Sequence, residues 1–353
     1  MEGDSVTSEM FTATISITVN EPFTLRAGSI IALILLPILT LCGLLGNLLV
    51  VISVFKFKQL RIVPNFFIVS LAVADLLVCM VVMPLALYQD INNGNWGLPP
   101  WLCDVWVSLD VLMSTASIWN LCVISLDRFL AITRPHQYAR RRTAFTVLFA
   151  VLTTWLLAAF LSIPTLLFVG GHDPTQTSTC VINVTPTFVI ISSCVAFYIP
   201  CAIVLVLYWR ILVAARRHVL HRRRVDPGIG STSREDATAS TAIDDGTTND
   251  QRFGENQPAE NTNPQRKIIS VTRERKAALV LAIVVGIFIC CWLPFFLVFV
   301  SLGICPQCHI SITAIVIVTW LGWCNSILNP IIYTIFNKEF RTAFRKIMTC
   351  TMK

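Results

Sequence analysis

The sequence predicts an all-α membrane protein, a bundle of seven transmembrane helices followed by a short amphipathic eighth helix, and three observations support this fold class. Of its 353 residues, 55% are hydrophobic and only 13% are charged, with a mean hydropathy of +0.71. Soluble domains carry about 25% charged residues. Seven stretches are apolar and reach the roughly 20 residues that a bilayer span needs. Basic residues gather in alternate connecting segments.

The seven stretches are continuous apolar runs without alternation, so each is predicted to be a helix rather than a barrel strand. They cover about 29–55, 65–89, 101–133, 145–168, 186–213, 277–302 and 310–335. No internal repeat is visible, which argues against a transporter built from duplicated halves. The predicted division is an N-terminal segment (1–28), the bundle (29–335) and a C-terminal segment (336–353).

The positions of Lys and Arg predict the orientation of the bundle. Basic residues follow the first, third, fifth and seventh stretches and precede the sixth, whereas the loops after the second, fourth and sixth contain none. Because short cytoplasmic loops carry an excess of positive charge, we expect an extracellular N-terminus and a cytoplasmic C-terminus. The net charge of +7 then reflects topology and attraction to membrane lipid, not nucleic-acid binding.

Two segments on the predicted cytoplasmic side have distinctive compositions. Residues of about 222–270 combine Ser, Thr, Asn and mixed charges with few apolar residues, so we expect a disordered loop. The basic, helix-forming flanks on both sides indicate that the fifth and sixth helices extend into the cytoplasm. In NKEFRTAFRKIM, Phe340 and Phe344 recur at helical spacing with basic residues on the other face. This predicts the amphipathic helix, lying along the inner membrane surface; a frayed polar tail is the alternative. Cys350, just beyond, is a candidate for palmitoylation.

Four of the thirteen cysteines fall on the predicted extracellular side: Cys103, Cys180, Cys305 and Cys308. An even number of cysteines in an oxidising compartment indicates two disulfides. We pair Cys103 with Cys180, and Cys305 with Cys308, since the latter two are neighbours in one short loop. Most other cysteines lie inside apolar stretches, where Cys behaves as a small hydrophobic residue.

Three ionisable residues inside the apolar stretches need an explanation: Asp75, Asp110 and Arg128. Each such group costs about 2.5–3.5 kcal/mol on membrane-insertion scales. Asp110 lies about 10 Å deeper than Cys103 at the helical rise, and no Lys or Arg lies at a similar depth in another stretch. A buried carboxylate without a partner is either protonated or accepts a cation from outside. The alternative is a carboxyl group hydrogen-bonded to a neighbouring helix.

Aromatic residues of the sixth and seventh stretches predict a cation pocket around Asp110, because aromatic rings commonly surround bound amines; plain packing is their alternative role. The hydroxyl groups of Ser192 and Ser193 either bind a ring hydroxyl of the ligand or bond to a carbonyl one turn earlier. The predicted ligand-binding residues are Asp110, Ser114, Ser192, Ser193, Ala196, Trp292, Phe295, Phe296, Phe299, Thr319 and Trp323.

Asp75 lies in the second stretch, with polar side chains available on the third and seventh. A polar cluster in a helix bundle either holds helices together or binds a small cation. We predict an allosteric sodium site formed by Asp75, Ser114, Asn325 and Asn329, and we expect no other metal and no cofactor.

Arg128 follows Asp127 near the inner end of the third stretch, and Glu274 lies at the inner start of the sixth. A pair between Arg128 and Glu274 would hold the inner face closed, and a buried charge pair is costly to half-break. Pro294 and Pro330 lie inside the sixth and seventh stretches and are expected to kink them. These features predict a switch at the inner face.

Seven motifs occur in order on successive stretches: GNLLV (46–50), LAVAD (71–75), DRF (127–129), Trp155, Pro200, FICCWLPFF (288–296) and NPIIY (329–333). Together they resemble the signature set of rhodopsin-like, class A G-protein-coupled receptors, although DRF departs from the commoner DRY. The resemblance implies a plasma-membrane receptor that activates a heterotrimeric G protein by outward movement of the sixth helix, with a receptor kinase and arrestin as further partners. It also implies an activation switch of Asp127, Arg128, Glu274, Phe288, Pro294, Asn329, Pro330 and Tyr333.

Within that class, the segment around Asp110 resembles biogenic amine receptors, in which this position pairs with the ligand ammonium. WLGW (320–323) with NSILNPIIY resembles dopamine receptors of the stimulatory-coupled subfamily. Ala196 and Phe299 depart from that subfamily, which usually has a hydroxyl and an Asn there. We expect a biogenic amine ligand, with dopamine-like ligands favoured and serotonin, octopamine, tyramine or a trace amine as alternatives.

Other functional classes lack the residues they need. A light-driven opsin requires a mid-membrane Lys, whereas every Lys here lies at or beyond the predicted cytoplasmic edge. An enzyme requires a nucleophile with a base, or a metal cluster, and all five His residues lie in loops or at the ends of stretches. The chain is therefore not expected to be an enzyme. A channel or transporter, with a polar path starting at Asp75, is the remote alternative.

Overall fold

The computed structural model describes residues 27–134, 137–138, 143–168, 180, 185–225, 264–305 and 307–349. Within 27–32, 215–225 and 264–281 it describes the backbone only. The regular elements of this part of the chain are all helical. Seven segments among them are long and apolar enough to cross a membrane, which confirms the predicted fold class.

The helices run in chain order as α1 (Ala27–Lys56), α2 (Asn65–Leu77), η1 (Val78–Val82), α3 (Met83–Ile91), α4 (Pro100–Thr133), α6 (Ala144–Phe168), α7 (Pro186–Ser193), η2 (Cys194–Tyr198), α8 (Ile199–Val225), α9 (Pro264–Ile304), α10 (Ile312–Phe336) and α11 (Lys338–Met348). The second span comprises α2, η1 and α3, and the fifth comprises α7, η2 and α8.

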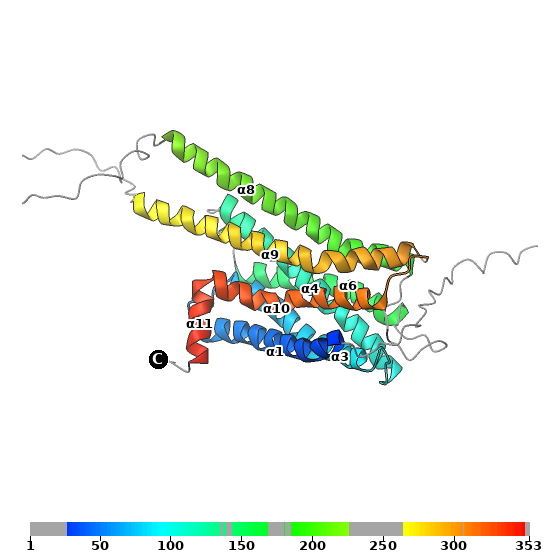
Figure 1. Ribbon diagram of the computed structural model, residues 1–353. Helices are drawn as coiled ribbons and strands as arrows, with labels where there is room; N and C mark the ends of the chain where they lie inside the picture. Colours follow the sequence, from blue (N-terminus) through cyan, green and yellow to red (C-terminus); the bar gives the residue numbers. More distant parts are fainter. Residues whose placement is uncertain are drawn as a thin grey trace, which may run out of the picture.

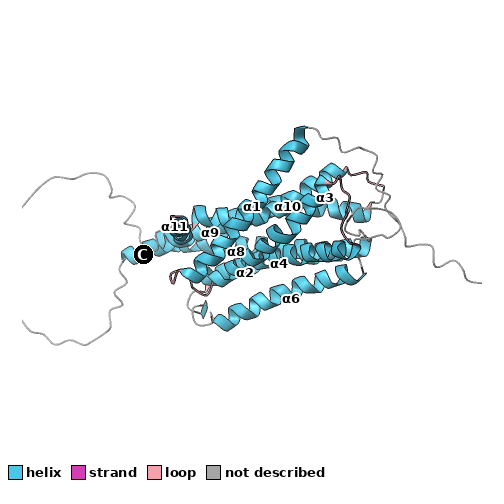
Figure 2. Ribbon diagram, turned by 90° about the horizontal axis from the view of Figure 1, so that it is seen from below, coloured by secondary structure: helices cyan, strands magenta, loops and turns pink. Residues whose placement is uncertain are grey.

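The spans lie side by side in one elongated bundle, and α11 lies across the end at which α10 finishes (Figure 1). α4 packs against α2, α6 and α8, so its residues reach the centre of the bundle. α6 lies at the edge of the bundle in the second view (Figure 2). Large apolar side chains face outward, among them Phe160 on α6 and Trp209 on α8, which are 69% and 66% exposed. Such an apolar exterior fits a protein surrounded by lipid.

Each of the two π-helical turns, η1 and η2, comes just before a proline, Pro84 or Pro200. A proline has no N–H to donate to the carbonyl four residues earlier, so the preceding turn is free to widen. The wider turn changes the direction of the side chains of α3 relative to those of α2, and of α7 relative to those of α8. These turns were not predicted from the sequence.

The fifth and sixth spans continue well beyond the predicted apolar stretches. α8 reaches Val225 and α9 begins at Pro264, as the basic, helix-forming flanks predict, and this narrows the predicted loop of about 222–270 at both ends. Lys, Arg, Gln and Glu in these flanks are good helix formers, and this explains the extension. Figure 1 shows both helices projecting beyond their neighbours at the end where α11 lies. Residues 226–263 lie outside the described part.

The described residues also confirm both disulfides and the amphipathic helix. Cys103 is bonded to Cys180 and Cys305 to Cys308, with Cα–Cα distances of 5.7 and 5.4 Å. In α11, Asn337 caps the first turn by accepting from two backbone N–H groups. Phe340 and Phe344 are buried in a second core with residues of α1 and α2, which holds α11 against the bundle.

Candidate ligand pocket

The carboxylate of Asp110 lies on α4, half-buried, and uses one of its two oxygens for hydrogen bonds within the protein. Oδ1 accepts from Ser114 Oγ at 3.0 Å and from Trp323 Nε1 on α10 at 2.8 Å. Among the described residues, no side chain or backbone group donates to Oδ2. The one ion pair found in this part of the chain lies elsewhere, between Arg128 and Asp127. Asp110 is thus hydrogen-bonded to a neighbouring helix, which is the alternative to a cation site given above for this residue. Its second oxygen, Oδ2, is still available to a cation.

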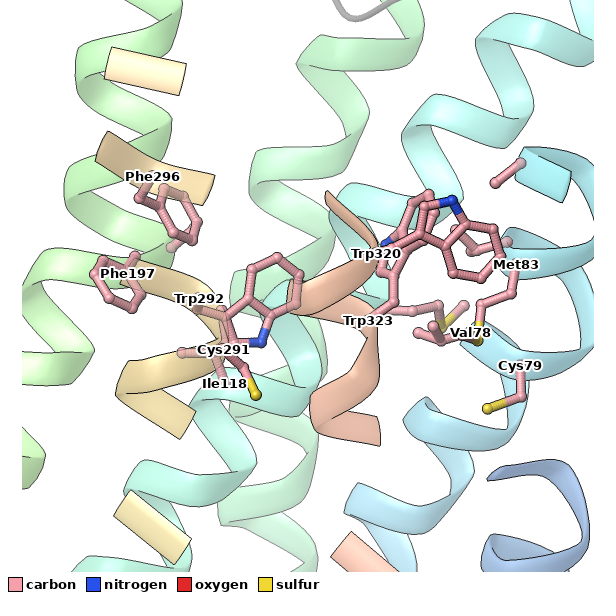
Figure 3. Close-up of a cluster of buried hydrophobic side chains, with 14 of the residues drawn as sticks. Val78, Cys79, Met83, Ile118, Phe197, Cys291, Trp292, Phe296, Trp320 and Trp323 are labelled. Atoms are coloured by element: carbon pink, nitrogen blue, oxygen red, sulfur yellow. The ribbon is translucent and has the colours of Figure 1, made fainter. Parts of the chain in front are cut away.

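Aromatic rings of α9 form a continuous wall near the centre of the bundle. Phe295 contacts Trp292 edge-on at a centroid distance of 5.8 Å and stacks with Phe299 at 5.6 Å. Phe296 stacks with Phe197 of η2 at 4.5 Å, with the ring planes only 11° apart. Figure 3 shows Trp292 between this Phe197–Phe296 pair and the indoles of α10. Phe197 is not among the predicted ligand-binding residues, since the direction of its side chain depends on the π-helical turn η2.

A second wall comes from two tryptophans of α10, three residues apart. The indoles of Trp320 and Trp323 meet edge-on at 5.3 Å. Trp320 Nε1 donates to Oδ2 of Asp90 on α3 at 2.8 Å, as Trp323 donates to Asp110. Asp90 is not among the predicted site residues, because it lies at the end of the second span, where a charged side chain can reach water. Two carboxylates, Asp90 and Asp110, are therefore each oriented by an indole of α10.

The two serines of α7 differ in their hydrogen bonding. Ser192 Oγ donates to the carbonyl of Val189 at 3.3 Å, which is the local bond that the sequence analysis gave as its alternative. Ser193 Oγ is fully buried and has no partner among the described residues. Ala196, one turn on, is buried and has no hydroxyl to offer. Thr319 donates to Ile315 O on its own helix at 2.8 Å. Ser193 is therefore the hydroxyl left for a ligand.

Asp75 is fully buried, and both of its oxygens accept hydrogen bonds. Oδ1 accepts from Ser117 at 3.0 Å and Ser326 at 2.8 Å, and Oδ2 accepts from Asn329 Nδ2 at 2.7 Å. Ser114 was predicted here, but its hydroxyl bonds to Asp110, and Ser117, three residues on, takes its place. The two hydroxyl oxygens and the carboxylate match the oxygen ligands that small hard cations use.

Asn325, the remaining residue of the predicted sodium site, has no bond to Asp75 among the described residues. Its side-chain Nδ2 is buried and has no partner in this part of the chain. Asn325 does not therefore join the carboxylate directly.

At the inner end of α4, Asp127 pairs with the adjacent Arg128 at 3.7 Å and accepts a hydrogen bond from the hydroxyl of Tyr138. The side chain of Glu274 lies outside the described residues, so the Arg128–Glu274 pair stays a prediction. The predicted lipid attachment site, Cys350, also lies outside them.

The remaining predicted switch residues belong to two groups. Phe288 is buried against Phe197, with a centroid distance of 5.7 Å, and Pro294 lies inside α9 about two turns further along. Pro330 packs against α1, where a Cβ on Gly46 would stand 2.9 Å from it. Tyr333 contacts Phe340 of α11 at 5.8 Å.

Comparison with known proteins identifies the family. The sequence-family model of the seven-transmembrane receptors of the rhodopsin family matches residues 46–333. The "D(4) dopamine receptor" of Mustela putorius furo is 41% identical over 316 residues, 86% of this chain and 87% of that protein. The "Probable G-protein coupled receptor No18" of Amphibalanus amphitrite is 38% identical over 346 residues, 91% and 90% of the two chains. The "5-hydroxytryptamine receptor 1D" of Homo sapiens is 37% identical over 343 residues, 93% and 91%.

These matches confirm the resemblance drawn from the motifs and place the chain among receptors rather than enzymes. They cover the spans that carry Asp75, Asp110 and Trp323. The chain is a multi-pass membrane protein and belongs to the rhodopsin family of seven-transmembrane receptors.

Proposed function

We propose that this receptor binds a biogenic amine at Asp110 and activates a heterotrimeric G protein. One observation carries the proposal. Oδ2 of Asp110 has no donor among the described residues, while Oδ1 is fixed by Trp323 and Ser114. An ammonium group supplies the charge and the N–H donor that this oxygen lacks, and charge-assisted hydrogen bonds of this kind are strong. The relatives named for dopamine and 5-hydroxytryptamine support an amine ligand.

The ring of the amine is expected to lie against the aromatic wall of α9 formed by Trp292, Phe295 and Phe296. Its ring hydroxyl would reach the unpaired Ser193 on α7. We favour a dopamine-like ligand, because Ser192 can still accept a hydrogen bond from a second ring hydroxyl while it donates to Val189. The absence of a hydroxyl at Ala196 favours serotonin, octopamine, tyramine or a trace amine as the alternative.

Activation would follow from the contact between the ligand and Trp292. Displacement of this indole would act on α9 beside Pro294, which has no N–H to donate to the carbonyl four residues earlier, so the helix can bend there. An outward movement of the inner half of α9 would open a cleft for the G protein. The ligand must bind this open form more tightly than the closed form. A receptor kinase and arrestin remain expected partners, and stimulatory coupling follows from the dopamine-like assignment alone.

The proposed location is the plasma membrane, with the N-terminus outside. The absence of Lys and Arg from three alternate loops supports this orientation, and the Cys103–Cys180 bridge at the same end fits an oxidising compartment. We also propose an allosteric sodium ion held by oxygens of Asp75, Ser117 and Ser326. Bound there, the cation would supply positive charge to a carboxylate that no Lys or Arg of the described residues pairs with.

The experiment is an amine panel on cells expressing the receptor, with cyclic AMP and calcium as readouts, comparing wild type with Asp110→Asn. The variant keeps an acceptor for Trp323 but loses the charge, so potency should fall about 100-fold, or roughly 3 kcal/mol. Asp90→Asn is the matched control, since it removes an equal negative charge from the carboxylate that accepts a hydrogen bond from Trp320. A normal amine response from a well-expressed Asp110→Asn receptor would refute the assignment.

A further inference from the structure

An apolar groove runs along the outer surface of the bundle where α1, α10 and α11 meet. It encloses about 540 Å³ and is lined on α1 by Cys42, Gly46 and Leu49, and on α10 by Ile327, Pro330, Ile331, Thr334 and Ile335. Its floor is the close contact between Gly46 and Pro330. From Ile327 to Ile335 the groove follows the helix axis for about 12 Å at the helical rise, close to the roughly 15 Å of one hydrocarbon leaflet.

The polar atoms of the groove are already satisfied locally. Thr334 Oγ1 donates to Pro330 O at 2.8 Å, and Thr349 Oγ1 donates to Arg345 O at 2.8 Å. The hydroxyl proton of each threonine is therefore already used within its own helix. The lining thus offers apolar contact along its length and suits a hydrocarbon chain.

Two arginines stand at the α11 end of the groove. Arg341 and Arg345 both line it, one helical turn apart, and both are exposed. Neither takes part in an ion pair among the described residues, and no Asp or Glu lines the groove. Arg341 makes only a long contact, 3.5 Å, with Ile335 O. The guanidinium groups, with five donors each, match the geometry of a phosphate or carboxylate.

We propose that this groove binds one anionic phospholipid, with an acyl chain along α1 and α10 and its headgroup on Arg341 and Arg345. Anionic lipids are enriched in the cytoplasmic leaflet, which is the leaflet beside α11 in the proposed orientation. The site is separate from the amine pocket and does not depend on it.

Charge argues against the other occupants. A sterol would bring a single neutral hydroxyl group and leave the positive charge of both guanidinium groups uncompensated. A second copy of this chain, related by a two-fold axis, would bring the same two arginines face to face and cause repulsion. An anionic lipid satisfies the apolar length and the charged end together.

The test uses the purified full-length receptor in nanodiscs of phosphatidylcholine mixed with phosphatidylserine or cholesterol, followed by native mass spectrometry of retained lipid. We expect one retained phosphatidylserine per receptor. Arg341→Gln with Arg345→Gln should weaken its retention about 30-fold, roughly fivefold for each basic contact. The matched control, Lys338→Gln with Lys346→Gln, removes equal charge from the same helix outside the groove and should leave retention within a few-fold of wild type.

A second pair of variants tests the groove itself. Ile331→Trp fills it while leaving both arginines in place, and should abolish retention; Ile317→Trp, on an exposed position of the same helix outside the groove, should not. Equal loss in the lysine control would show diffuse attraction to the membrane and overturn the proposal. Equal retention of cholesterol or phosphatidylcholine would also overturn the proposal, as would an Ile331→Trp receptor that still holds phosphatidylserine. The same conclusion would follow if hydroxylamine released the bound chain, because that chain would then be an acyl group attached to a cysteine by a thioester.

Discussion

Trp323 donates its indole N–H to Oδ1 of Asp110 at 2.8 Å, across the interface between α10 and α4. This bond does two things for the carboxylate. It fixes the orientation of the side chain, and it leaves Oδ2 as the oxygen that faces an incoming cation. A preorganised carboxylate loses less conformational freedom when a ligand binds, and this favours affinity.

Replacing Trp323 with Phe should weaken amine binding without abolishing it. The variant keeps an aromatic ring beside Asp110 but removes the N–H donor, and a hydrogen bond to a charged group is worth about 1.5 kcal/mol. We expect a rise in Kd of roughly tenfold, measured by competition binding. Trp320→Phe, which removes the equivalent bond to Asp90, should change Kd much less. Equal effects of the two substitutions would mean that the indole bonds serve packing alone.

Ser193 should recognise a ring hydroxyl on the ligand, because its own hydroxyl is buried without a partner in the described residues. Ser193→Ala should lower the affinity for tyramine or dopamine by about five- to tenfold, or roughly 1–1.4 kcal/mol. Affinity for phenethylamine, which has no ring hydroxyl, should stay unchanged. Ser192→Ala should have the smaller effect, since that hydroxyl already donates to Val189. A similar loss for all three amines would assign Ser193 to packing.

The fold was largely predictable from the sequence, because in a membrane each span must satisfy its own backbone hydrogen bonds. Apolar length therefore defines the helices, and the positions of basic residues predict their orientation. Four cysteines allow three pairings, and the closeness of Cys305 and Cys308 in the chain selects the observed one. The π-helical turns before Pro84 and Pro200 were not predictable in the same way. A proline removes one hydrogen bond, but packing decides whether the helix kinks or widens.

The candidate site was predictable in its charges and less so in its partners. Asp110 stood out because no cation shared its depth. Ser114 and Ser117 lie on one face of α4, three residues apart, and sequence cannot tell which is level with Asp75. Which serine is level with Asp75 depends on how far α4 is shifted along its axis relative to α2. Asp90 gave no signal, because its importance comes from Trp320 on another helix.

The difference between Ser114 and Ser117 leads to a test of the sodium site. Agonist affinity should fall when sodium chloride replaces choline chloride at equal ionic strength, if the cation favours the closed form. Asp75→Asn should remove this dependence and Ser117→Ala should weaken it. Ser114→Ala should keep it, because that hydroxyl bonds to Asp110. Loss of the sodium effect in Ser114→Ala, with Ser117→Ala unaffected, would contradict the cluster described here.

Gly322 allows Trp292 to pack against the backbone of α10. A Cβ at this position would stand 2.9 Å from the indole, so Gly322→Ala should force the ring to shift. Overpacking a core costs typically about 1–3 kcal/mol, and we expect a lower midpoint in thermal unfolding of the purified receptor. Gly286→Ala is the control, since a Cβ there meets nothing within 4 Å and Ala is the better helix former. An unchanged midpoint for Gly322→Ala would show that Trp292 moves freely.

The pairing of Arg128 at the C-terminal end of α4 bears on the resting state of the receptor rather than on ligand binding. In the described residues Arg128 pairs only with its neighbour Asp127, at 3.7 Å, and its side chain is 35% exposed. A contact from Glu274 on α9 would add a tie between α4 and α9 that an outward movement of α9 must break. Glu274→Gln should therefore raise basal G-protein signalling several-fold, measured as nucleotide exchange without agonist. Glu274→Asp, which retains the charge, should raise it less. If a well-expressed Glu274→Gln receptor shows the same or lower basal exchange, α9 is held closed by its packing and not by this pair.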